Sequence, residues 1–167
     1  MAPRIQRLFH IAYACYDAEE TRAFYEDILE LPLVNCMGGD HVPSTGEKMD
    51  YLHFFLEMGD GSYVAFFDTK MTERPAPSPN TPGWVQHLAL EVDAPEDVRV
   101  WAERLRVAGV ETTEIVDHGF IESIYFEDPN GHRLEITART EGPEFLERVR
   151  REARPALDAW TQTKRSS

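Results

Sequence analysis

The sequence has little of three things: cysteine, long apolar runs and basic side chains. Its two cysteines, Cys15 and Cys36, are too few for a disulfide framework, and the apolar run around Cys15 predicts a buried, reduced thiol. No apolar run approaches the ~20 residues that cross a bilayer. The opening residues, MAPRIQRLFH, are also too polar for a secretory signal. We therefore expect a cytoplasmic protein with no membrane partner.

The shortage of basic residues bears on the choice of partner. Seventeen Lys and Arg stand against thirty Asp and Glu, which gives a formal net charge of −13. Such a field repels phosphate backbones, so we expect no nucleic-acid partner. With 167 residues, 42% of them hydrophobic, the chain is long enough to form one structural domain around a sizeable core.

What the sequence does contain is an internal repeat. Shifted by 77 positions without a gap, residues 10–33 overlay residues 87–110 and match His10 with His87, Ala12 with Ala89, Glu19 with Glu96, Arg22 with Arg99, and Glu26 with Glu103. Each copy reads as a short strand (8–15 and 85–92) followed by an amphipathic helix. Asp17 is the expected N-cap of the first helix, Pro95 begins the second, and Gly109 marks its end. Residues 50–68 and 123–138 then read as hairpins.

The repeat sets the expected organisation. We predict an α+β protein with a first module over residues 4–69, a proline-rich linker over 70–83, a second module over 84–140 and a helix over 143–161. Pro155 invites a break or kink in that last helix. We expect this helix to cover an open sheet edge of its own chain, with a dimer contact as the alternative.

Three polar residues stand out because they fall on strands. His10 and His87 occupy the same position of a repeated strand, so both rings are predicted to face one concavity if the modules pair about a pseudo-twofold axis. Glu135 places a carboxylate within the apolar run RLEIT, where it needs a cation. One alternative is an ion pair with Arg133, two residues away. The other is a metal: two imidazoles and one carboxylate suit Fe(II) or Mn(II), and zinc less naturally.

Over about residues 4–140 these features resemble the vicinal oxygen chelate superfamily, which includes glyoxalase I, extradiol ring-cleaving dioxygenases, fosfomycin-resistance transferases and bleomycin-binding proteins. The resemblance implies two βαβββ modules that form a curved mixed sheet around a metal. Its ligand positions fall here on His10, Ala65, His87 and Glu135. Glyoxalase I uses a glutamate where this chain has Ala65, so the remaining three residues fit the extradiol dioxygenases better.

A longer motif points to the same branch. The run VDHGFIESIYFEDPNGHRLE, residues 116–135, fits the extradiol signature; its second half is shared with the fosfomycin-resistance transferases, so His118 discriminates between them. By resemblance, Tyr125 would hydrogen-bond the substrate and His118 would line the pocket. The alternatives are a core aromatic for Tyr125 and a solvated loop residue for His118. For the acid–base histidine we choose His53 over His41, because a strand positions a side chain more firmly than a loop.

The resulting hypothesis is an extradiol-type dioxygenase that uses Fe(II), or Mn(II) as the alternative metal, to cleave a catechol-like substrate with vicinal oxygens using O2. The rivals are a Mn(II)-dependent thiol transferase of the fosfomycin-resistance type and a non-catalytic binding protein of the bleomycin-resistance type. A loop over residues 37–50 is expected to wall the pocket. A homodimer is one partner state that the sequence allows, and pairing of the modules within one chain or between two chains stays open.

Overall fold

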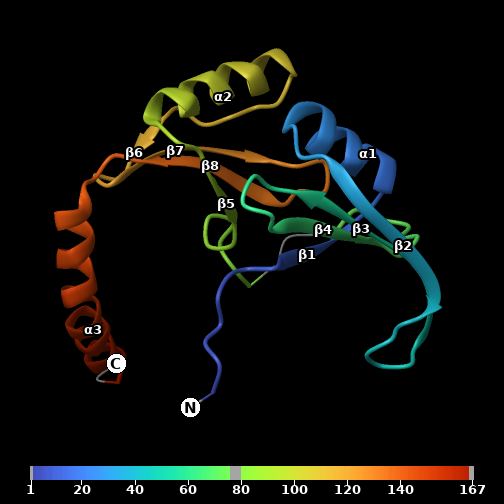
Figure 1. The fold of residues 1–167 in the computed structure, drawn as a ribbon, viewed down its shortest axis with the longest axis horizontal. Helices are drawn as coiled ribbons and strands as arrows, with labels where there is room; N and C mark the ends of the chain where they lie inside the picture. The colour runs from blue at the N-terminus through green and yellow to red at the C-terminus, as the bar shows by residue number, and fades with distance from the viewer. Residues whose placement is uncertain (1, 76–79, 166–167) are drawn as a thin grey trace.

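The computed structural model describes residues 2–75 and 80–165, and within them the strands form two four-stranded mixed sheets (Figure 1). The first sheet has the order β1-β4-β3-β2, from β1 (His10–Cys15), β2 (Leu33–His41), β3 (Lys48–Glu57) and β4 (Tyr63–Asp68). The second has the order β5-β8-β7-β6, from β5 (Leu88–Glu91), β6 (Val116–Asp117), β7 (Ile121–Glu127) and β8 (Arg133–Arg139). In the first sheet β1 runs parallel to β4, and in the second β5 runs parallel to β8. The other neighbouring pairs are antiparallel. The expected α+β fold of two equivalent modules is confirmed.

The helices between the strands begin where the sequence indicates. Asp17 caps α1 (Ala18–Arg22), and its Oδ1 accepts from the Glu20 N–H at 2.8 Å. The segment continues as a π-helix, η1 (Ala23–Ile28), which the sequence did not predict. In the second module α2 (Pro95–Val107) starts at its proline, and Gly109 follows its end with φ +78°, a conformation that favours glycine.

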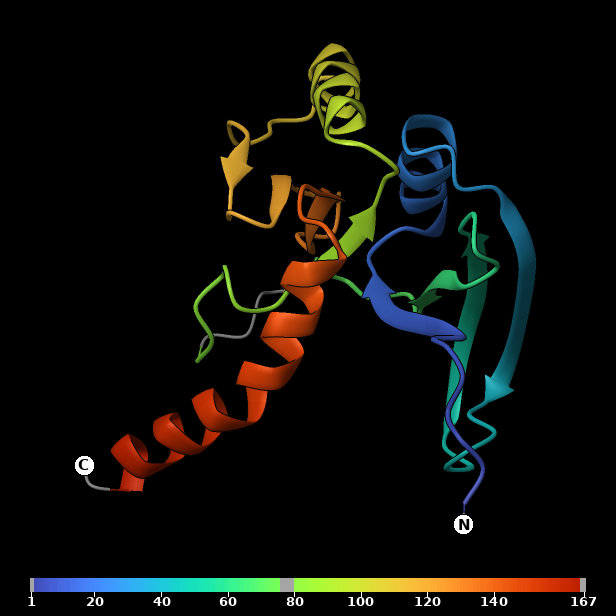
Figure 2. The same ribbon diagram turned by 60° about the vertical axis from the view of Figure 1, so that its left-hand side comes forward.

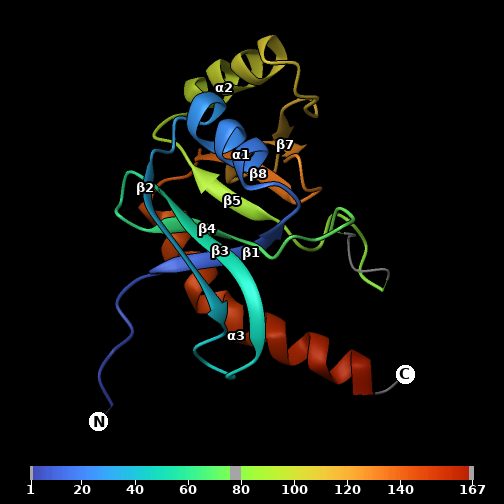
Figure 3. The ribbon, with the colours of Figure 1, turned by 90° about the vertical axis from the view of Figure 1, so that its right-hand side faces the viewer.

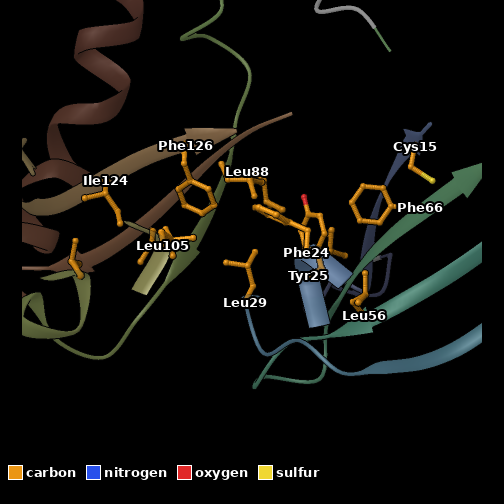
Figure 4. Close-up of a cluster of buried hydrophobic side chains, with 14 of the residues drawn as sticks. Cys15, Phe24, Tyr25, Leu29, Leu56, Phe66, Leu88, Leu105, Ile124 and Phe126 are labelled. Carbon is orange, nitrogen blue, oxygen red and sulfur yellow. The ribbon is translucent and has the colours of Figure 1, made fainter. Parts of the chain in front are cut away.

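The helices cover one face of the two sheets and build a core shared by both modules. Figure 4 shows Phe24 and Tyr25 of η1 between Phe66 of the first sheet and Phe126 of the second, with Leu105 of α2 nearby. Each side chain of this size stabilises the fold by about 1.5–3 kcal/mol when fully buried. Because strand residues alternate in direction, the residues between these core positions lie on the opposite, helix-free face of each sheet.

A buried polar junction fixes one module against the other. The turn between β7 and β8 places Asn130 against the start of the first module, where its Nδ2 donates to Thr21 Oγ1 at 3.1 Å and its Oδ1 accepts from the Tyr16 N–H at 2.9 Å. Next to it the Tyr25 hydroxyl donates to Asp128 Oδ2 at 3.0 Å. These bonds between the modules form when the modules hold this orientation, so the junction favours it.

Cys15 is fully buried and free, as predicted, whereas Cys36 is free and exposed on β2. Burial raises the pKa of the Cys15 thiol to about 12, so this thiol stays protonated and unreactive at neutral pH.

The segment 37–50, expected to be a loop, is mostly strand: β2 extends to His41 and β3 begins at Lys48. Every residue of β2 is exposed, so the strand lacks the apolar alternation by which strands are recognised. Glycine at position 38 is required by a close approach, because a Cβ there would lie 2.9 Å from the backbone oxygen of Tyr51.

The C-terminal helix α3 (Pro143–Arg165) begins where predicted. Of the break or kink expected at Pro155, the break is wrong, because the helix runs uninterrupted through that residue. It lies on the side of the sheets opposite α1 and α2 (Figures 1 and 3). Phe145 stacks on Phe120 of its own chain with ring centroids 5.5 Å apart. Of the helices in the described residues, none combines the length and apolarity that a bilayer crossing requires.

We predict that Asn130→Ala lowers the free energy of unfolding by about 1–3 kcal/mol, because it removes the acceptor of the Tyr16 N–H and a donor to the buried Thr21 hydroxyl, which keeps only its bond to the Asp17 backbone oxygen. Asn35→Ala is the matched control, because it makes the same change at an exposed position of β2. Its effect should stay below about 1 kcal/mol. Urea titrations would contradict this view of the junction if the two variants lost equal stability.

Candidate metal-binding site

The helix-free face of the first sheet carries two histidines, which with their aromatic neighbours we call the histidine cluster (His10, His53, Phe55 and Phe67). His53 is 9% exposed, and its ring stacks on Phe67 with centroids 3.7 Å apart. His10 is exposed at the start of β1, with its ring centroid 6.1 Å from that of His53. A methyl group stands at position 65 on β4, and it is fully buried.

The tautomer of His53 follows from its hydrogen bond. Its Nδ1 lies 2.9 Å from the backbone oxygen of Phe66. A carbonyl oxygen only accepts, so Nδ1 carries the proton and Nε2 of the neutral ring keeps its lone pair. The backbone thus presets His53 as a proton acceptor or a ligand.

The second sheet carries what we call the carboxylate cluster (His87, Ser123, Tyr125 and Glu135). Glu135 is 3% exposed on β8; its Oε2 lies 3.0 Å from His87 Nε2, and its Oε1 accepts from Ser123 Oγ at 2.5 Å. An ion pair with Arg133, the alternative raised by the sequence, is not formed. The guanidinium instead lies over the Tyr125 ring, with Cζ 4.5 Å from the centroid, and its buried Nε has no hydrogen-bond partner among the described residues.

Tyr125 lies directly across the β7–β8 ladder from Glu135 and is half-buried outside the core. Its hydroxyl lies 2.9 Å from Nε2 of His118, which is itself exposed. Burial, and then the charge of Glu135, raise the pKa of the Tyr125 phenol. The phenol therefore stays protonated at neutral pH and can donate a hydrogen bond.

The structure thus brings His87, directly before β5, and His118, between β6 and β7, to Tyr125 and Glu135 of the second sheet, and it places His10 with His53 on the first. Across residues 2–75 and 80–165, no three His, Cys, Asp or Glu side chains come close enough together to hold a metal ion. Within a single chain, His10 is therefore not joined to His87 and Glu135.

The comparisons with known proteins agree with this fold. Residues 7–136 match the family model of the Glyoxalase/Bleomycin resistance protein/Dioxygenase superfamily. The chain belongs to this superfamily. Superfamily members include dioxygenases and other enzymes, and they bind small molecules.

Solved structures of the same superfamily share its fold. A glyoxylase/bleomycin resistance protein/dioxygenase domain from Frankia sp. EAN1pec is 18% identical, with a TM-score of 0.66 over 81% of this chain and 99% of that one. A mutant of the fosfomycin resistance protein FosX from Listeria monocytogenes, complexed with Mn(II) and 1S,2S-dihydroxypropylphosphonic acid, is 22% identical, with a TM-score of 0.58 over 84% of this chain and 97% of that one. At least one structural neighbour in the superfamily therefore binds a divalent metal.

Among curated proteins, MhqA of Bacillus subtilis (strain 168), whose name assigns it provisionally as a ring-cleaving dioxygenase, is 26% identical over 140 residues. The match covers 83% of this chain but only 42% of MhqA, so the chain spans less than half the length of that relative.

Sequence reasoning missed Ser123. The signal was present, because Ser123 lies two residues before Tyr125 on the same strand and so on the same face. It pairs with Thr137, which lies two residues after Glu135 on the neighbouring strand. A hydroxyl at that position lies within reach of both the buried carboxylate and the hydroxyl of Thr137.

We expect Ser123→Ala to lower the free energy of unfolding by about 1–3 kcal/mol, since one buried oxygen of Glu135 loses its donor. Ser44→Ala, in an exposed turn, is the control and should change stability by less than about 0.5 kcal/mol. Thermal or urea unfolding measures both. If Ser123→Ala leaves the free energy of unfolding unchanged, the hydroxyl does not stabilise the carboxylate.

Proposed function

We propose that this protein is a metal-dependent enzyme, an extradiol-type dioxygenase that acts on a catechol-like substrate with vicinal oxygens, and that His10, His87 and Glu135 are its metal ligands. The observation that carries the proposal is the carboxylate cluster. A nearly buried glutamate lies 3.0 Å from an imidazole Nε2, with a protonated tyrosine beside it.

The donor atoms fit a divalent metal. Two ligand atoms bound at about 2.0–2.2 Å to one ion lie roughly 3 Å apart, which is the separation of His87 Nε2 and Glu135 Oε2. One carboxylate and neutral imidazoles suit Fe(II) or Mn(II) and leave positions open for a substrate. Two ligands from one chain are one short of this set.

The third ligand, His10, comes under this proposal from a second copy of the chain. β1 and β5 each end their sheet with an unpaired edge. Exposed apolar side chains precede both histidines: Phe9, directly before His10, is 61% exposed, and Trp84, three residues before His87, is 70% exposed. Exposed apolar groups beside unpaired edges favour coverage by another chain. A dimer in which the first sheet of one copy faces the second sheet of the other would complete the ligand set twice.

The chain's own residues then divide the work. A bound Fe(II) supplies the positions at which the vicinal oxygens of the substrate and O2 meet. Tyr125 donates a hydrogen bond to a substrate oxygen, and His118 orients the phenol. His53 Nε2 accepts a proton from a substrate hydroxyl, because its Nδ1 is held protonated by Phe66. Phe55 and Phe67 offer apolar contacts to an aromatic ring. The name of MhqA supports this choice of reaction.

Mixing two defective variants tests the shared centre. His10→Ala and Glu135→Ala, each purified alone, should bind no stoichiometric iron or manganese. After joint unfolding and refolding, half of the dimers are mixed and each holds one intact centre, so we expect about a quarter of the wild-type metal content. Metal analysis after desalting measures it, with each variant refolded alone as the control. Full binding by wild-type monomers and none in the mixture would contradict the shared site.

Two further variants test the division of roles. Tyr125→Phe should lower kcat about 10²-fold or more with the metal retained, because a donor to the substrate is lost. His53→Gln should lower it about 10²–10⁴-fold, also with metal retained, whereas the exposed His41→Gln should be neutral. Oxygen uptake by the Fe(II)-loaded enzyme, reconstituted anaerobically, would be followed on a panel of catechols. Metal loss in either variant, or no uptake on any catechol, would count against the assignment.

One observation favours the rival transferase. Arg133 lies beside the carboxylate cluster without an ion-pair partner among the described residues, so its guanidinium is available to an anion such as a phosphonate. In the FosX complex the ligand is a dihydroxypropylphosphonic acid with Mn(II).

If the rival function holds, thiol addition to a phosphonate epoxide under Mn(II) should be detectable, and Arg133→Gln should raise the KM at least about tenfold. For the dioxygenase on a neutral catechol, the same change should leave KM within about threefold. If the purified protein holds no metal after incubation with either Fe(II) or Mn(II), the non-catalytic binding protein would be favoured.

A further inference from the structure

The helix α3 exposes an apolar surface that the proposed function does not use. At 3.6 residues per turn its large apolar residues fall on one stripe, and ten of the sixteen residues outside the stripe are charged. We call this the α3 stripe; its members are Phe145, Leu146, Val149, Ala153, Ala156, Leu157 and Trp160.

Only the first part of the stripe has a partner in its own chain. Phe145 stacks on Phe120, and Leu146 and Val149 line an apolar groove with Ile121. Beyond Val149 nearly every described residue of α3 is exposed, including Leu157 at 57% and Trp160 at 69%. Figure 2 shows this part of the helix leaving the rest of the molecule. A free helical segment of this length is marginal in water, so an uncovered stripe needs a partner.

Charge indicates what the partner is. Residues 143–165 hold six basic and four acidic side chains, a net charge of +2 within a chain whose net charge is −13. The body of any other copy is therefore strongly acidic and attracts α3. An anionic membrane surface would attract the helix but repel that acidic body, which makes it the weaker candidate.

The hairpin of β2 and β3 offers the matching surface. All residues of β2 are exposed, and apolar side chains gather there: Val34 is 47% exposed, Met37 47% and Met49 39%. β2 is also an unpaired edge, and Asp40 and Glu47 near its end are exposed. A long exposed edge with apolar side chains is a surface that proteins cover.

We propose that α3 of each copy docks its stripe on the β2–β3 hairpin of a second copy. Figure 1 shows α3 and this hairpin projecting to the same side of the chain from opposite ends, away from α1 and α2. A twofold axis on that side makes the contact reciprocal, with each helix on the partner's hairpin. This surface involves none of the proposed metal ligands, so the docking can be tested without metal or activity.

Cross-linking through Met37→Cys of β2, in a Cys36→Ser background, tests the contact directly, because Met37 pairs with His53 and so points to the face of the hairpin that carries Met49. Trp160→Cys in that background should form an intermolecular disulfide between positions 37 and 160 under mild oxidation, mapped by mass spectrometry. Arg151→Cys, on the opposite side of α3, should not, and Cys15 is buried and silent in both. Equal yields of the two cross-links, or no 37–160 product, would overturn the proposal.

Sedimentation velocity provides the second measurement. Leu157→Gln with Trp160→Gln should raise the dissociation constant of the dimer about tenfold or more, whereas Arg151→Gln with Glu152→Gln, which also leaves net charge unchanged, should not. Circular dichroism checks that both variants fold. An unchanged dimer in the first variant overturns the proposal. So does a monomeric wild type whose α3 binds phosphatidylglycerol vesicles.

Discussion

The buried junction between Asn130 and the first module is the contact on which the rest of the structure depends. The side-chain amide of Asn130 hydrogen-bonds both the Thr21 hydroxyl and the Tyr16 backbone N–H, and the neighbouring Asp128 accepts a hydrogen bond from the Tyr25 hydroxyl. These bonds form in one orientation of the modules and set both sheets under a shared layer of helices. The same orientation keeps the histidine cluster and the carboxylate cluster on the helix-free face, and it leaves α3 and the β2–β3 hairpin on that side.

The two clusters differ in chemistry although they descend from one repeated pattern. The histidine cluster is apolar around its rings, with aromatic neighbours and the methyl of Ala65. The carboxylate cluster is ionic, with Glu135 held between His87 and Ser123. An aromatic substrate with two adjacent oxygens has the same division, and the proposed function places its ring and its oxygens accordingly. The unpaired Arg133 is the residue that separates the two enzymatic alternatives.

Much of the fold followed from sequence because the repeat and the capping residues are local signals. Asp17, Pro95 and Gly109 bound helices as predicted, and the hairpins formed. β2 was missed because an exposed strand has no buried face to impose a two-residue period, and Pro155 misled because an exposed helix flanked by good helix formers tolerates one missing bond. The apolar strand pattern singled out Glu135 and the motif over residues 116–135 singled out Tyr125; the repeat placed His10 at the start of β1, whereas His87 lies directly before β5. These patterns could not tell which residues meet across modules, since that depends on contacts such as those of Asn130 that no local pattern encodes.

The separation of His10 from His87 and Glu135 links two equilibria. Under the proposed pairing, an isolated chain has an incomplete set of donors, so capture of the ion and association of subunits reinforce one another by the same factor. Dilution would then release metal, and a chelator would weaken self-association, without any change inside either module. The cellular abundance of the polypeptide would itself set how much of it is active.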